Sequence, residues 1–151
     1  QIHSRLPLLE LEIIKEKTGI PIIKTLSVPA QGETSSESPG KSAFASSLLE
    51  EVSLLEDADI VDSILLDSAR PEKPGGTGCV HDWTLSRRIS EETQLPLILA
   101  GGLKPENVRE AVRVVSPYAV DTASGVETCG KKDAVKIKSF IEEVRCANAF
   151  L

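Results

Sequence analysis

The chain has 151 residues, a length that suits one domain with a sizeable buried core, and we expect residues 1–151 to form a single domain. Aromatic residues make up only 3%, so aliphatic side chains must fill that core. A formal net charge of −6 without a basic stripe argues against a nucleic-acid partner, and no apolar run is long enough to predict a membrane partner. Three scattered cysteines are typical of reduced thiols and predict a cytoplasmic protein.

The beginning of the chain is unusual for a complete translation product. It contains no methionine and opens at Gln1-Ile2-His3, inside what the pattern predicts to be a strand. We therefore expect a fragment or a processed chain.

Short apolar strands alternate with helices along the sequence. We expect strands at 1–3, 20–28, 61–67, 95–101 and 118–122. Helices are expected at 7–18, at 43–57, from a cap at Asp82 to about 93, after Pro105, and after a cap at Asp133. The residues 29–42 and 68–80 are rich in Gly, Pro and Ser and are predicted to be loops.

Two of the helices carry clear apolar faces. After Pro105 the spacing i, i+3, i+4, i+7 joins Val108, Ala111, Val112 and Val115, and the last helix repeats that spacing in Ile137, Phe140, Ile141 and Val144. The strands are aliphatic and uninterrupted, as in sheets buried on both faces. Alternation of this kind predicts an α/β fold with a parallel sheet of about five strands and five helices.

Two successive strand-to-helix turns are the most informative feature. The first contains Gly101-Gly102 and the second Ala123-Ser124-Gly125, each directly after a short apolar strand. Small residues let backbone N–H groups approach an anion closely, and a following helix adds its dipole. The pair predicts a phosphate-binding site, although tight turns without a ligand would give the same pattern.

Two aspartates end predicted strands on the same rim. Asp67 closes the run Ile64-Leu65-Leu66, where partial burial would raise the pKa of its carboxyl and suit it to general acid catalysis. The alternative is a cap of the turn at Ser68. Asp121 either joins the site or makes a turn hydrogen bond.

The remaining polar candidates have weaker signals. Gly75-Gly76-Thr77-Gly78 could form a lid or only a turn, and Asp82-Trp83 favours a helix start with a core tryptophan. Lys24 interrupts an apolar strand and is expected to extend outward to solvent. His3 is interpreted as a terminal residue rather than a ligand, and Glu127 as a partner of Lys131 or Lys132.

Taken together, these segments resemble the phosphoribosylanthranilate isomerase family of tryptophan biosynthesis. The order and spacing match over nearly all of the chain, in the segments Gln1-Ile2-His3, Ile23-Lys24-Thr25-Leu26-Ser27-Val28, Leu65-Leu66-Asp67-Ser68, Gly75-Gly76-Thr77-Gly78, Asp82-Trp83, Leu99-Ala100-Gly101-Gly102-Leu103, Pro105-Glu106-Asn107-Val108, Val120-Asp121, Ser124-Gly125-Val126-Glu127 and Gly130-Lys131-Lys132-Asp133.

The resemblance implies a TIM-type (β/α)₈ barrel and an intramolecular oxidoreductase, an aldose–ketose isomerase without cofactor or metal. Its substrate is N-(5-phosphoribosyl)anthranilate, and an Amadori rearrangement yields the carboxyphenylamino deoxyribulose phosphate. The residue matching Asp67 is the family's general acid, the two small-residue turns at Gly101-Gly102 and Ala123-Ser124-Gly125 hold phosphate, and the residue matching Asp121 lies beside the anthranilate amine.

The sequence departs from the family pattern at its beginning. The family's general base is a cysteine in a Lys-Ile-Cys-Gly motif that these 151 residues lack, and an arginine that holds anthranilate lies in the same part. We therefore expect only the C-terminal five βα units of the barrel, inactive alone, prone to self-association and dependent on the N-terminal portion. Smaller departures are Ser4 for glycine, His81 for an aromatic residue, and Thr122-Ala123 for Val-Ser.

Two alternatives to the isomerase remain at this point. One is a non-catalytic phosphate-binding barrel fragment that keeps the two turns without the base. The other is an isomerase of a different sugar phosphate with the same fold and phosphate site.

Overall fold

A parallel sheet forms the centre of the molecule, whose computed structural model describes residues 1–29, 39–69 and 80–149. Its strands lie in chain order: β1 (Ile23–Pro29), β2 (Ser63–Ala69), β3 (Leu97–Leu99) and β4 (Ala119–Val120). Ile2 adds a parallel bridge to Lys24 of β1. This arrangement confirms the prediction of an α/β fold with a parallel sheet.

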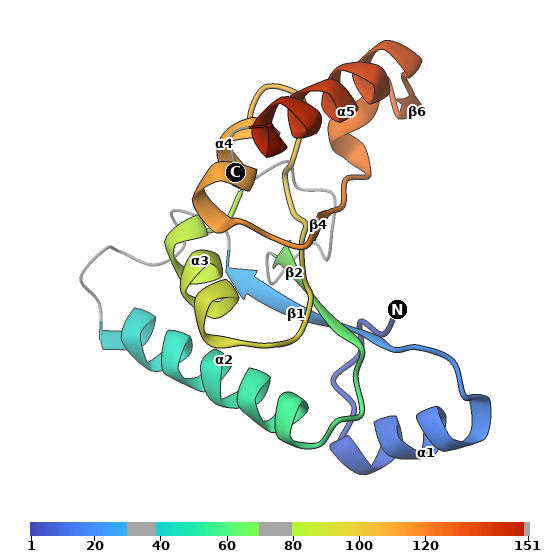
Figure 1. Cartoon of the computed structure of the whole chain (residues 1–151), viewed down its shortest axis with the longest axis vertical. Helices are drawn as coiled ribbons and strands as arrows, with labels where there is room; N and C mark the ends of the chain where they lie inside the picture. Colours follow the sequence, from blue (N-terminus) through green and yellow to red (C-terminus); the bar gives the residue numbers. More distant parts are fainter. Residues whose placement is uncertain (30–38, 70–79, 150–151) are drawn as a thin grey trace.

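The helices alternate with the strands of the parallel sheet along the chain, beginning with α1 before β1. They are α1 (Leu8–Thr18), α2 (Pro39–Asp57), α3 (Trp83–Glu92), α4 (Val108–Val115) and α5 (Ala134–Asn148). A 3₁₀ turn η1 (Ser124–Val126) and a small hairpin of β5 (Glu127–Thr128) and β6 (Lys131–Lys132) precede α5. Helix α3 packs on α4 and α4 on α5, while α1 and α5 lie at opposite ends of the molecule (Figure 1).

Local sequence signals account for several helix boundaries. The Asp82 carboxylate accepts from the backbone N–H of Thr84 at the start of α3, and Asp133 accepts from Val135 and Lys136 at the start of α5. Both caps were predicted, because a carboxylate satisfies N–H groups that a first turn leaves unpaired. Gly19 ends α1 in the left-handed conformation, with φ +62°.

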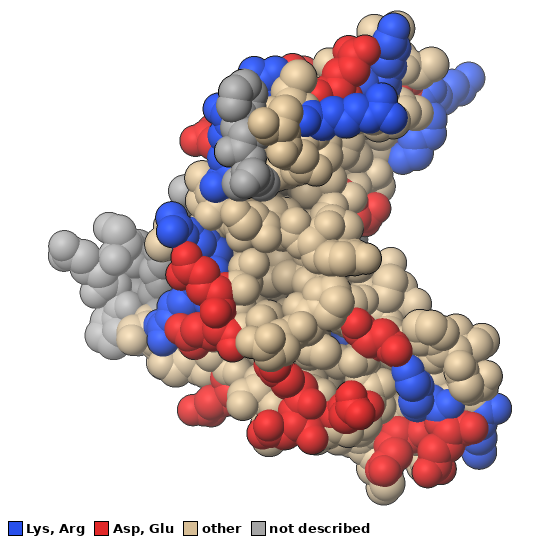
Figure 2. All heavy atoms as spheres, viewed as in Figure 1, with Lys and Arg blue, Asp and Glu red and all other residues tan. Residues whose placement is uncertain are grey.

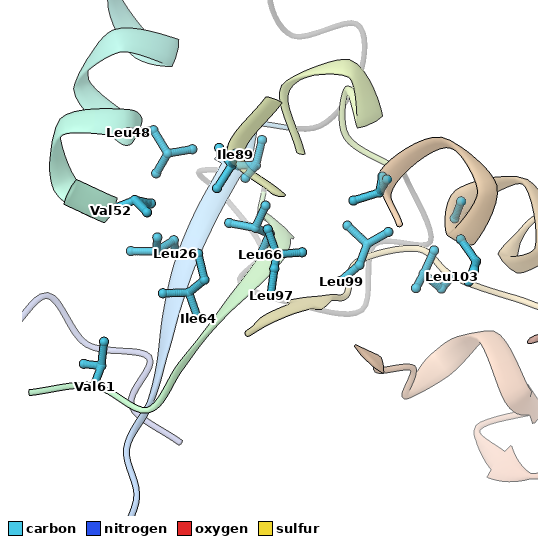
Figure 3. Close-up of a cluster of buried hydrophobic side chains, with 14 of the residues drawn as sticks. Leu26, Leu48, Val52, Val61, Ile64, Leu66, Ile89, Leu97, Leu99 and Leu103 are labelled. Atoms are coloured by element: carbon cyan, nitrogen blue, oxygen red, sulfur yellow. The ribbon is translucent and has the colours of Figure 1, made fainter. Parts of the chain in front are cut away.

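The core consists of aliphatic side chains between the sheet and the helices. Leu48 and Val52 of α2 point toward Leu26 of β1, and Ile89 of α3 lies over β2 and β3 (Figure 3). The predicted face of α4 is confirmed, since Val108, Ala111, Val112 and Val115 are all buried. Burying one of these valines contributes about 1.5–3 kcal/mol.

The extents of several elements differ from the sequence prediction. Helix α2 begins at Pro39 rather than 43, since proline is tolerated in a first helical turn despite the loop-like composition. Strand β2 begins at 63 and continues to 69 because its pairing with β1 outlasts the apolar run. Strand β1 begins only at 23. Strands β3 and β4 contract to 97–99 and 119–120, because β3 pairs with β2 only over 97–99 and with β4 only over 98–99.

The buried face of α5 was predicted incorrectly. Phe140 and Ala147 are buried and Val144 is partly buried, but Ile137 and Ile141 remain 37% and 44% exposed. Helix α5 packs against α4 and η1, which cover one side of its apolar surface. The apolar spacing correctly predicted a helix, but the packing of α4 and η1 determines which of its apolar side chains are buried.

Charge is unevenly spread over the surface. On the face shown in Figure 2, acidic side chains gather over α1 and α2, and basic ones near α5, without a continuous basic band. Within the described ranges, no helix has the length and apolarity needed to cross a membrane.

Candidate active site

The carboxyl ends of β2, β3 and β4 lie side by side and bring the predicted site residues together. The register pairs Leu66 with Leu99 and Leu99 with Val120, so the residues after these positions reach the same edge. Hydrogen bonds continue the pairing one step further, from Ala100 N to Leu66 O at 2.8 Å and from Asp121 N to Leu99 O at 2.9 Å. Polar groups from three strands therefore meet at one rim.

A cavity of about 290 Å³ opens at this rim. Most of the predicted site residues line it together with the N-terminal segment: Gln1, His3, Leu65, Asp67, Ser68, Ala100, Gly101, Gly102, Asp121, Thr122, Ala123 and Ser124. Gly125 is the one predicted residue outside this cavity, and it lines an adjoining one. The cavity is large enough for a small phosphorylated molecule.

Asp67 is half-buried at the end of β2 and faces this cavity. Burial raises the pKa of its carboxyl, and the charge of Asp121 raises it further. The charge of His3 and the backbone N–H of Ser68 act in the opposite direction, toward a lower pKa. The contact with Ser68 is the one expected if Asp67 caps the turn. The raised pKa of its carboxyl is the property expected of a general acid.

The first small-residue turn requires glycine for two separate reasons. Gly101 and Gly102 have φ of +82° and +66°, which L side chains rarely adopt. A Cβ on Gly101 would also lie 2.3 Å from the backbone N and the Oγ of Ser68. The turn therefore presents bare backbone to the cavity.

Asn107 fixes that turn, a role that the sequence analysis missed. Its Nδ2 donates to the Gly102 carbonyl at 3.0 Å, and its Oδ1 accepts from the backbone N–H of Lys104 at 2.8 Å. An asparagine directly before a helix was the available signal, because it favours such local backbone bonds.

The second turn packs directly against the first. A Cβ on Gly125 would lie 1.8 Å from the Leu103 carbonyl, and the Thr122 hydroxyl donates to that same oxygen at 2.7 Å. Lys132 Nζ donates to the Ala123 carbonyl at 2.7 Å and pairs with Glu127 at 3.0 Å. The predicted Glu127–lysine pair is confirmed, and it belongs to the support of this turn.

A second cavity, of about 360 Å³, lies between the two turns. Gly102 and Ser124 line both cavities, and the second is completed by Lys104, Glu106, Gly125 and Lys136. Backbone N–H groups of tight turns and the ammonium groups of Lys104 and Lys136 favour an anion here, whereas the Glu106 carboxylate opposes one. The two turns and the two lysines are therefore the candidate anion-binding part of the site.

Lys24 does not extend to solvent as predicted. It is 3% exposed, and its Nζ donates to the carbonyls of Thr25 at 2.8 Å and Ser4 at 3.3 Å. Burial lowers its pKa, while Glu51 acts to raise it and Arg5 to lower it. It lines a separate cavity of about 300 Å³ and takes no part in the rim described above.

His3 was interpreted as a terminal residue rather than a ligand. It is exposed, yet it lines the rim cavity and its charge acts on Asp67. The predicted lid at Gly75–Gly78 and Cys79 lie outside the described residues. Among the residues that are described, no group of three His, Cys, Asp or Glu could hold a metal ion.

The chain is similar in sequence and fold to known proteins. Residues 1–143 match the family N-(5'phosphoribosyl)anthranilate (PRA) isomerase. The N-(5'-phosphoribosyl)anthranilate isomerase 1 of Methanosarcina mazei is 71% identical over 152 residues, covering all of this chain and 63% of the relative. The chain thus spans about three fifths of that relative's length.

Solved structures of the same family have the same fold. Phosphoribosyl anthranilate isomerase from Thermococcus kodakaraensis superimposes with a TM-score of 0.73 at 39% identity, over 96% of this chain and 62% of the other. Another family structure, holding reduced 1-(o-carboxyphenylamino)-1-deoxyribulose 5-phosphate, gives 0.63 at 32% identity, over 95% and 57%. With a family match over most of its length and these relatives, the chain belongs to the N-(5'phosphoribosyl)anthranilate isomerase family.

Proposed function

We propose that this protein isomerises N-(5-phosphoribosyl)anthranilate in tryptophan biosynthesis, and that this chain contributes the general acid and the phosphate site. The observation that carries the proposal is the convergence of Asp67 and both small-residue turns on two adjoining cavities at one sheet edge. A half-buried carboxyl with a raised pKa holds a proton more readily than an exposed one, as an acid catalyst requires.

Asp67 acts on the ring oxygen of the ribose. It donates a proton there as the bond between this oxygen and the anomeric carbon breaks, and the bonding electrons stay on the oxygen. As that bond breaks, the lone pair of the anthranilate nitrogen, which is already bonded to C1, forms the C=N bond of an iminium ion. A base removes the proton from C2 to give an enolamine. The enolamine gains a proton at C1 and loses the proton of its C2 hydroxyl, which gives the ketone product.

The remaining roles follow the family resemblance. Asp121, which is exposed and lines the same cavity, lies beside the anthranilate amine. The phosphate sits against Gly101, Gly102, Ala123, Ser124 and Gly125, with Lys104 and Lys136 facing it. The base that takes the C2 proton is the cysteine of the Lys-Ile-Cys-Gly motif, which these 151 residues do not contain.

The chain forms the last five βα units of a TIM-type barrel. The parallel sheet with its strands in chain order, extended by the bridge at Ile2, supports this assignment, in which Ile2 belongs to the fourth strand and β4 is the eighth. Apolar side chains are exposed on both end helices, namely Leu8, Leu9 and Ile13 on α1, and Val135, Ile137 and Ile141 on α5. These are the surfaces that neighbouring barrel helices would cover.

The deciding experiment is a turnover assay on the full-length gene product. Loss of the substrate's anthranilate fluorescence should be rapid, and isothermal titration should show that reduced 1-(o-carboxyphenylamino)-1-deoxyribulose 5-phosphate binds. Binding without turnover would favour a non-catalytic phosphate-binding protein. Turnover of another sugar phosphate, but not of this substrate, would favour a different isomerase.

A further inference from the structure

Three buried polar side chains form a hydrogen-bonded chain on the other side of the β2 end from Asp67. Ser68, His81 and Ser86 are 1%, 1% and 0% exposed. Ser68 Oγ lies 2.7 Å from His81 Nδ1, and His81 Nε2 lies 2.6 Å from Ser86 Oγ. The chain joins the end of β2 to the first part of α3 through a residue that precedes the helix cap.

The histidine ring is neutral at physiological pH. Burial lowers the pKa of His81 to about 4, against the opposing effect of Asp82 on the same segment. A neutral imidazole has one N–H donor and one acceptor nitrogen, so it matches two hydroxyls that each both donate and accept. The ring therefore bridges Ser68 and Ser86 without placing a charge in the interior.

Ser68 links this chain to both parts of the candidate site. Its backbone N–H hydrogen-bonds the Asp67 carboxyl. Its backbone N and Oγ also pack against Gly101 so closely that a Cβ there would be 2.3 Å from either atom. Any shift of Ser68 would move the acid and the first phosphate-binding turn relative to each other.

We propose that His81 is a positioning residue for the isomerase reaction, holding Ser68 against α3 and thereby fixing the Asp67 carboxyl beside the Gly101 turn. The inference rests on the proposed function, in which Asp67 is the acid. Misplacing a reacting group by a fraction of an ångström slows chemistry more than it weakens binding. A purely structural role would instead affect stability alone.

A matched pair of substitutions separates these roles. The amide of asparagine reaches about as far as Nδ1 of histidine, and that of glutamine about as far as Nε2. His81→Asn therefore keeps the link to Ser68 and loses the one to Ser86, whereas His81→Gln does the reverse. Each variant loses one buried hydrogen bond, so their thermal stabilities should fall together.

The kinetic prediction concerns the full-length gene product. We expect kcat of His81→Gln to fall about 10-fold with little change in KM, and that of His81→Asn to fall much less. Ser90→Ala on the same helix, whose hydroxyl has only a long 3.5 Å bond to the Ser116 carbonyl, serves as a control and should keep full activity. Equal kcat values for the two His81 variants would overturn the proposal.

A second readout does not depend on turnover. Carbon-13 NMR titration of the Asp67 carboxyl should give a higher pKa in His81→Gln than in wild type or His81→Asn, because the Ser68 N–H bond that lowers it is weakened. His3 and Asp121 carry the other charges that act on the pKa of Asp67, and both residues are unchanged in every variant. An unchanged Asp67 titration in His81→Gln would overturn the inference.

These measurements also keep the two proposals apart. If the wild-type protein does not turn over the substrate, the proposed function fails, while the Asp67 titration still decides the positioning role. If both His81 variants fail to fold, Ser68→Ala takes their place, because it removes the bonded hydroxyl and leaves the ring. Unchanged kcat and Asp67 pKa in that variant would then refute the role of the hydrogen-bonded chain.

Discussion

Burial shifts the pKa of one titratable group on each side of the carboxyl end of β2, the side facing the rim cavity and the side facing α3, and the two shifts have opposite directions. On the cavity side, burial raises the pKa of Asp67 and favours its protonated form. On the helix side, burial lowers the pKa of His81 and also favours its neutral form. The same desolvation thus moves the two pKa values in opposite directions, because it penalises whichever form is charged.

The two sides also differ in how completely their polar groups are paired. His81 is buried and hydrogen-bonded to Ser68 and Ser86, whereas Asp67 borders a cavity that His3 and Asp121 also line. The first arrangement is suited to a fixed geometry and the second to proton transfer. The following predictions test this difference.

The largest effect is expected at the acid itself. Asp67→Asn keeps the shape of the side chain but has no acidic proton to donate, so kcat should fall by ~10²–10⁴-fold, with KM changing far less. Fluorescence kinetics on the full-length gene product measure both values. Asp59→Asn, an exposed residue in the turn before β2, is a matched control. Unchanged kcat in Asp67→Asn would leave Asp67 as a turn residue only.

Acid should destabilise the protein through His81. Its folded pKa of about 4 lies below the ordinary 6.5, so the unfolded chain binds more protons between these values and stability is lost as pH falls from 6.5 to 4. The full loss amounts to about 3 kcal/mol. Thermal unfolding followed by circular dichroism across this range should show it. His81→Phe removes the titrating ring and should flatten the slope.

Gly101 lines the rim cavity and also packs against Ser68 of the buried hydrogen-bonded chain. Gly101→Ala places a Cβ against Ser68 and at a strained φ, so it should weaken binding of the product analogue by about 10- to 100-fold and lower the melting temperature. Gly19→Ala has a similar positive φ with nothing within 4 Å of the added Cβ. This control should lose stability without losing affinity in calorimetric titration. Equal affinities for the two variants would place the phosphate elsewhere.

Replacing the acid should also stabilise the fold. Because the folded pKa of Asp67 is raised, the folded state binds more protons than the unfolded chain above the ordinary pKa, and stability falls as pH rises through the folded pKa. At neutral pH the buried charge is therefore a cost that Asp67→Asn removes. We therefore expect Asp67→Asn to unfold at a higher urea concentration than the wild type at pH 7. No gain at pH 7 would mean that the carboxylate is well compensated.

The smallest effect is expected from Asp121. Its charge raises the pKa of Asp67, so Asp121→Asn should lower that pKa. A general acid works only while protonated, so activity should then decline at a lower pH as pH rises. The pH profile of kcat/KM measures this shift, independently of any overall loss of rate. A shift to higher pH would contradict the repulsion between the two carboxyls.

The sequence by itself determined the local features of this protein. The caps at Asp82 and Asp133, the buried face of α4 and the glycine turn at Gly101-Gly102 each depend on a few neighbouring residues, and all are present. The rim position of Asp67 was also predictable, because strand ends of a parallel sheet meet at one edge.

The tertiary structure decided everything that depends on distant neighbours. Lys24 is buried because Ser4 and Thr25 offer carbonyls to its ammonium group, and Ile137 and Ile141 stay exposed because α4 and η1 cover only one side of α5. In the sequence, His81 was noted only because the family pattern has an aromatic residue at that position. Its role depends on hydroxyls in β2 and α3 that only the folded chain brings within hydrogen-bond distance, since burial and pairing are properties of packed elements rather than of local sequence.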